Sequence, residues 1–128
     1  MTQPTRTPKR TQVMAILNVT PDSFSDGGQH THVDTILAQV ARWVSLGVDI
    51  VDIGGESTRP GAHGVSVEDE CARVVPVIQA IRERFPALTL SIDTRKAAVA
   101  EAALQVGAQW VNDVSGLCFD SAMLDMVV

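Results

Sequence analysis

Several features that mark particular protein classes are missing from this chain of 128 residues. No apolar run approaches the roughly 18 residues that a membrane-spanning helix needs. The first ten residues hold three basic residues and two prolines but no hydrophobic segment, unlike a secretory signal. We therefore expect no membrane association, a disordered leader at residues 1–11 and one domain at residues 12–128.

Cysteine and several ligand-binding motifs are also scarce or absent. Cys71 and Cys118 lie far apart, and no CxxC pair or ligand-spaced cluster of His and Cys exists, so zinc is not expected. We expect two partly buried thiols in a reducing cytosol, and hence a cytoplasmic protein. The glycine patterns of a P-loop and of a dinucleotide-binding fold are missing too. Their absence argues against nucleoside triphosphates and dinucleotides as ligands.

Positive charge is in short supply: 10 Lys and Arg face 15 Asp and Glu, which gives a net charge of −5. Because the three basic residues at positions 1–10 are unopposed there, the remaining chain carries −8, that is −5 minus 3. An acidic surface is repelled by nucleic acid, so we expect no nucleic-acid partner. A local anion site can still exist, since a few side chains and backbone amides suffice to make one.

The residues that are present predict a globular α/β domain. Helices are expected near residues 32–46, from Ser66 to about 85, at 96–106 and from about 121. Short β-type runs at 12–17, 49–53, 88–92 and 109–111 alternate with them. Gly47 is a suitable helix stop and Ser66 a suitable N-cap, whereas Pro76 should kink the second helix or split it in two.

Strict alternation of strands and helices without hairpin signals predicts a parallel sheet. Two architectures satisfy this pattern. One is an open four-stranded sheet, and the other is the first half of a (β/α)8 barrel, which needs eight such units and about 250 residues.

Each predicted strand ends in, or runs into, a carboxylate or a carboxamide. In a parallel sheet these ends share one rim, where ligands bind, so the side chains should converge on one pocket. The alternative is that they serve as turn formers that bond to their own backbone. The residues are Asn18, Asp52, Asp93, and Asn112 with Asp113.

The loop after the second strand reads GGESTRPG at residues 54–61. Its glycines allow close backbone approach, Thr58 offers a hydroxyl, and Arg59 brings a forked cation suited to phosphate. An ordinary polar turn with a solvated Arg59 is the other interpretation.

Aromatic residues are few, and their positions differ in character. Trp43 and Trp110 fall in a predicted helix and strand and are expected in the core. Phe24 stands alone in a polar loop, where it either anchors the loop or forms one wall of a pocket for a flat ligand.

Two long stretches resemble the signatures of one enzyme family, dihydropteroate synthase. They are VMAILNVTPDSFSDGG at 13–28 and GVDIVDIGGESTRPGA at 47–62, and SIDT at 91–94 with VNDVSG at 111–116 match the next two strand ends. The resemblance implies a (β/α)8 TIM barrel, of which this chain covers about the first four βα units.

The resemblance also implies an activity. The family joins 6-hydroxymethyl-7,8-dihydropterin diphosphate to 4-aminobenzoate, releasing pyrophosphate and 7,8-dihydropteroate, and sulfonamides compete with the aminobenzoate. Full-length members are expected to form homodimers. The family's roles fall on Asn18 for Mg²⁺, Thr58 and Arg59 for pyrophosphate, Asp93 and Asn112 for the pterin, Phe24 and Pro60 for the aminobenzoate pocket, and Asp52 at its base.

Three hypotheses about function follow from this resemblance. The chain stops before the family's later lysine and Arg-x-His pair, so we expect an incomplete barrel that is part of a synthase and inactive alone. A second hypothesis is a fragment that binds pterin or pyrophosphate without turnover. A third is a methyltetrahydrofolate-handling methyltransferase of the wider group, against which the Ser-Thr-Arg-Pro loop argues, because such enzymes hold no pyrophosphate.

Overall fold

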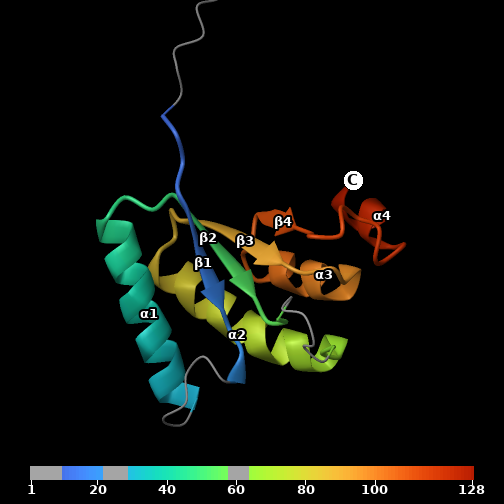
Figure 1. Ribbon diagram of the computed structural model, residues 1–128. Helices are drawn as coiled ribbons and strands as arrows, with labels where there is room; N and C mark the ends of the chain where they lie inside the picture. Colours follow the sequence, from blue (N-terminus) through green and yellow to red (C-terminus); the bar gives the residue numbers. More distant parts are fainter. Residues whose placement is uncertain (1–9, 22–28, 58–63) are drawn as a thin grey trace, which may run out of the picture.

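The computed structural model describes residues 10–21, 29–57 and 64–128, except for the side chains of residues 29–31. In these ranges strands and helices alternate, as the sequence predicts (Figure 1). The elements are β1 (Met14–Asn18), α1 (Gln29–Ser45), β2 (Ile50–Gly54), α2 (Val67–Arg84), β3 (Thr89–Asp93), α3 (Ala97–Gln105), β4 (Trp110–Asn112) and α4 (Met123–Val127).

The four strands form one parallel sheet in the order β1-β2-β3-β4. Each strand therefore pairs with its neighbour in sequence, and a helix makes every return. Figure 1 shows α2 and α3 behind the sheet and α1 beside the β1 edge. All strands point the same way, so their carboxyl ends form a single edge, here called the carboxyl rim.

Alternate strand residues face the helices and build the core. Leu17, Val51, Ile53, Leu90 and Ile92 are buried against the apolar stripe of α2 and the alanines of α3. Fully burying one such side chain contributes about 1.5–3 kcal/mol. This layer fixes which residues of each strand face the other way, because side chains alternate along a strand.

The ends of the helices follow the sequence signals. Ser66 caps α2 by accepting a hydrogen bond from the Asp69 backbone N–H at 3.1 Å. Gly47 follows α1 with φ of +92°, a conformation that glycine adopts without strain. Pro76 was expected to kink α2 or to split it in two. The helix continues from Val67 to Arg84 with Pro76 inside, so it is not split.

Among the described residues, no helix covers the second face of the sheet, and the apolar side chains on its two edge strands are exposed. Ile16 is 65% exposed, Met14 38% and Trp110 46%. Trp43 packs against the core as expected, but the expectation of a core position for Trp110 is wrong, because β4 is an edge strand and Trp110 points away from the helices. Both cysteines are free; Cys71 is half-buried, as expected, whereas Cys118 is exposed, contrary to the expectation of a partly buried thiol.

The segment before β1 is attached to the sheet at Asp49. The Asp49 carboxylate accepts the Val13 backbone N–H at 2.8 Å and pairs with Arg10. Residues 1–9 of the expected leader lie outside the described residues. Within the described ranges, none of the helices has the length and apolar character required to cross a membrane.

Candidate functional site

The strand register places the polar strand ends in one row across the helix-free face. Asn18 pairs in register with Gly54, Gly54 with Asp93, and Asp93 with Asn112. Gly54 contributes no side chain, which leaves a gap in the row between Asn18 and Asp93. A Cβ at Gly54 would lie 3.5 Å from the Asp93 carboxylate oxygen Oδ2. The row is therefore a shallow polar floor at the carboxyl rim.

A second row lies on the same face, two residues before the strand ends, and supports the first row. It consists of Ile16, Asp52, Ser91 and Trp110. Asn112 donates from Nδ2 to Asp52 Oδ2 at 3.0 Å, so Asp52 fixes the orientation of the Asn112 carboxamide. Asp52 Oδ1 and Ser91 Oγ are buried without a hydrogen-bond partner among the described residues. Because buried polar atoms are normally hydrogen-bonded, we expect a ligand or water to bind these two atoms.

Asp93 is the most strongly perturbed acid on this floor. Burial, and after it the nearby carboxylates of Asp52, Glu70 and Asp113, together raise the pKa of Asp93 to about 6. At neutral pH its carboxyl group is mainly ionised, but a modest local change can protonate it. Perturbed carboxyl groups in a rim position are typical of functional sites.

Asp113, unlike its neighbour Asn112, forms its hydrogen bonds within the loop after β4. Its carboxylate accepts the Ser115 backbone N–H at 2.8 Å, the Ser115 hydroxyl at 2.7 Å and the Leu117 backbone N–H at 3.1 Å. The turn-forming interpretation is therefore right for Asp113, which orders the loop after β4.

The loop after β2 begins in a tightly built segment. Arg73 on α2 donates from Nη1 to the Gly55 carbonyl at 2.8 Å. Glycine is required at position 55 because a Cβ there would lie 2.9 Å from Val74 Cγ1. The next residue, Glu56, is paired with both Arg95 and Lys96 at the end of β3.

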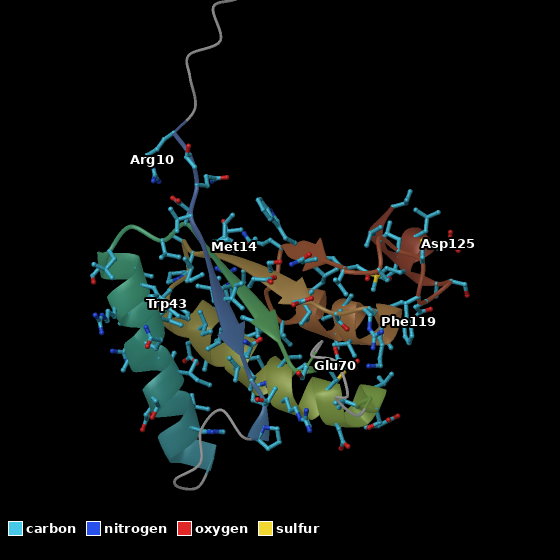
Figure 2. The ribbon with its side chains drawn as sticks, viewed as in Figure 1. Arg10, Met14, Trp43, Glu70, Phe119 and Asp125 are labelled. Atoms are coloured by element: carbon cyan, nitrogen blue, oxygen red, sulfur yellow. The ribbon has the colours of Figure 1, made fainter. Side chains whose placement is uncertain are left out.

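These contacts belong to a four-membered ion cluster formed by Glu56, Glu70, Arg95 and Lys96. Lys96 Nζ donates to Glu70 Oε1 at 2.7 Å, and Thr94 Oγ1 donates to Glu70 Oε2 at 2.5 Å. Glu70 is 1% exposed in the first turn of α2 (Figure 2). Burial favours a higher pKa for Glu56, but hydrogen bonds and charges from Lys96 and Arg95 outweigh it, and the pKa lies below its usual value.

Neither the ion cluster nor Ser91 was predicted from the sequence as part of a site. One signal was available for Glu70, which stands four residues before Val74 and so belongs to the buried stripe of its helix. A charged residue on such a stripe needs a partner. Ser91 offered no comparable signal. Four predicted site residues, Phe24, Thr58, Arg59 and Pro60, lie outside the described residues.

The fold and the rim together define a class. Successive βα units that form a parallel sheet, with helices on one face and polar side chains at the carboxyl ends of the strands, are the arrangement found in (β/α)8 barrels. The four βα units described here belong to that barrel class and form an α/β structure.

Comparison with known proteins identifies the family. The profile of the family described as pterin binding enzyme matches residues 14–128, and the chain belongs to this family. A curated relative from Synechocystis sp., named dihydropteroate synthase, is 52% identical over 116 residues, which are 91% of this chain and 40% of the relative. The chain thus spans well under half the length of the curated relatives it matches, and its resemblance to dihydropteroate synthase is confirmed.

Solved structures agree with this assignment. Dihydropteroate synthase from Clostridium difficile, crystallised in the presence of pteroic acid, superposes with a TM-score of 0.87 at 49% identity, covering 93% of this chain and 45% of that one. The Xanthomonas albilineans enzyme with 4-aminobenzoic acid gives a TM-score of 0.84 at 52% identity, covering 92% and 42%.

Proposed function

We propose that the protein containing this chain is a dihydropteroate synthase. It joins 6-hydroxymethyl-7,8-dihydropterin diphosphate to 4-aminobenzoate and releases 7,8-dihydropteroate and pyrophosphate. The observation that carries the proposal is the row of Asp93 and Asn112 at the carboxyl rim, in a chain of the pterin binding enzyme family. The relatives named dihydropteroate synthase support the particular reaction.

Pterin recognition follows from the hydrogen bonds of the floor. The Asn112 carboxamide donates one N–H to Asp52, so its side-chain oxygen Oδ1 and its second N–H can bind a ligand. The ionised Asp93 carboxylate is an acceptor only. Together the two side chains match the mixed donors and acceptors along the edge of a pterin ring.

The diphosphate is assigned to Thr58 and Arg59, which follow Glu56 in the loop after β2, and to a Mg²⁺ ion at Asn18. The donor chemistry fits, because Mg²⁺ keeps several waters and takes few protein oxygens besides substrate phosphates. No group of three or more His, Cys, Asp or Glu among the described residues could hold a metal by itself. Bound Mg²⁺ supplies charge neutralisation for the departing pyrophosphate.

Phe24 and Pro60 are assigned to the 4-aminobenzoate pocket, and sulfonamides are proposed to compete there. The arrangement needs no protein nucleophile. Asp52, Asp93 and Asn112 hold the pterin, Arg59 attracts the leaving group, and catalysis rests on positioning and electrostatic stabilisation. A cytoplasmic location and a homodimer are also proposed, and both are supported by the family resemblance alone.

The test of the proposal is a synthase assay with an Arg59→Ala variant. The unaltered protein should form dihydropteroate from the two substrates in the presence of Mg²⁺. In the variant, kcat/KM for the diphosphate substrate should fall by about 100-fold, the loss expected when one charge-stabilising group is removed.

Binding of a bare pterin is the control, since it has no diphosphate for Arg59 to hold. Its dissociation constant, measured by calorimetry, should change by less than about threefold, well under the 1.4 kcal/mol of a tenfold change. Equal losses for the two ligands would contradict the role of Arg59, and the absence of turnover in the unaltered protein would contradict the proposed function.

A further inference from the structure

Three loops at the carboxyl rim are connected by a single side chain, Arg95. Its Nη2 atom pairs with Glu56 Oε1 in the loop after β2. Its guanidinium carbon lies 4.3 Å from the centre of the Phe119 ring in the segment after β4. Arg95 itself follows β3. Figure 2 shows Phe119 beside the N-terminal end of α3.

The neighbouring Lys96 differs from Arg95 in its surroundings. Lys96 pairs with Glu56 and with the buried Glu70, and its side chain is only 16% exposed. Removing Lys96 would leave a buried carboxylate unpaired, a change that destabilises a fold strongly. The Arg95 side chain is 34% exposed and pairs with Oε1 of Glu56. Arg95 is therefore less needed for folding than Lys96, and its contacts join loops rather than core elements.

Arg95 also lies close to the proposed pterin contacts. Glu56, Asp93, Arg95 and Val114 line the same small cavity. Glu56 comes two positions before Thr58, the first proposed diphosphate contact, and Phe119 comes seven positions after Asn112.

We propose that Arg95 is a positioning residue for the synthase reaction, which sets the loops after β2 and β4 relative to Asp93 by holding Glu56 and Phe119 at once. The inference rests on the proposed function and extends it to a residue outside the substrate contacts. Displacement of a substrate group by about 1 Å costs roughly 100-fold in rate, so the loss of such a connection is measurable.

The experiment compares Arg95→Met and Arg95→Lys in the protein that contains this chain. Arg95→Met should raise KM for the pterin diphosphate about tenfold or more and change KM for 4-aminobenzoate by less than about threefold. Arg95→Lys keeps the ion pair and should recover most of the loss. Phe119→Leu should give a smaller effect in the same direction, because stacking contributes only part of the contact.

Arg82→Met is the matched control. Arg82 donates to the carbonyls of Leu88 at 2.7 Å and Gly107 at 2.8 Å, at the opposite end of the sheet. Its loss should lower the unfolding temperature without changing either KM, because that end of the barrel serves stability. If Arg95→Met behaves like Arg82→Met, with lower stability and unchanged KM, the proposal is overturned.

A second measurement does not depend on turnover. Glu56→Gln removes the charge that holds Arg95, and amide hydrogen exchange should then accelerate at residues 114–119, in the loop after β4. Unchanged exchange there would overturn the connection whatever the assay shows. A protein without synthase activity that nevertheless shows this acceleration would contradict the proposed function and leave the connection between the loops intact.

Discussion

Asp93 shows how a single residue acquires its properties from the elements around it. It ends β3, beside the empty position of Gly54 and within reach of the charges of Asp52 and Glu70. Burial and these charges raise its pKa to about 6. A pterin donor bound to the carboxylate would offset the same effects, since hydrogen bonds to the charged form favour it.

The raised pKa predicts a dependence of stability on pH. Between 3.8, the usual value, and about 6, folded Asp93 retains a proton that the unfolded chain has lost. Because the folded state then binds more protons, the contribution of Asp93 to stability falls as pH rises through this window. Asp93→Asn should remove that fall. Its free energy of unfolding relative to the unaltered chain should increase from pH 4 to 6 and level off above.

Urea unfolding at a series of pH values measures this difference. Asp113→Asn serves as a control, because its carboxylate is engaged by the turn after β4. Two parallel stability curves for the unaltered chain and Asp93→Asn would contradict the assigned pKa.

At the scale of the element, α3 depends on a residue far along the chain. Its own N-cap position, Lys96, provides no side-chain hydrogen bond to the helix. Instead Asp120 accepts the Ala97 backbone N–H at 2.8 Å, and its second oxygen accepts the Ala122 N–H at 2.9 Å. These bonds lower the pKa of Asp120 and satisfy one of the free N–H groups at the start of α3.

Asp120→Ala should therefore destabilise the chain by uncapping α3. We expect a midpoint of thermal unfolding lower by a few degrees, and near recovery in Asp120→Asn, because asparagine caps about as well as aspartate. Asp34→Ala, at an exposed position of α1, is the control for loss of an acid. An Asp120→Ala variant that unfolds with the midpoint of Asp34→Ala would show that the cap is unimportant.

The element scale also shows what the sequence could reveal. Local signals were sufficient for α2, where Ser66 as N-cap and the apolar spacing predict the helix. Pro76 does not split α2, because a proline inside a helix costs stability but does not prevent the helix from continuing when it is packed against a core. The cap of α3 could not be predicted, since Asp120 lies 23 residues from Ala97 and only the tertiary fold brings them together. For the same reason, the pairing of Glu56 with Arg95, 39 residues away in the sequence, could not be predicted.

On the scale of the whole molecule, the helix-free face combines a polar floor with exposed apolar side chains. Ile16 and Met14 lie on edge strand β1 and Trp110 on edge strand β4. Unpaired edges and apolar patches favour association. The alternation of strands and helices alone left an open sheet and a barrel as alternatives, because strand order and curvature are set by packing between units. The resemblance to dihydropteroate synthase predicted the barrel, and the structural neighbours confirm it.

When the 128-residue chain is expressed by itself, we expect it to associate through this face. Sedimentation should show species larger than a monomer at high concentration, and Ile16→Lys should shift them towards monomer. Leu46→Lys is the control, since Leu46 is 72% exposed but lies after α1, away from the face. Equal behaviour of Ile16→Lys and Leu46→Lys would show that the face does not drive association.

The register of the sheet has a consequence for how related sequences can differ in length. Asn18, Gly54, Asp93 and Asn112 stand in one row because each strand contributes its last residue to it. Residues added to a connecting loop leave that row in place. One residue inserted within a strand would turn every following side chain to the opposite face and send the site residue into the helix layer. Length variation among homologues should therefore be found between strands and never inside them.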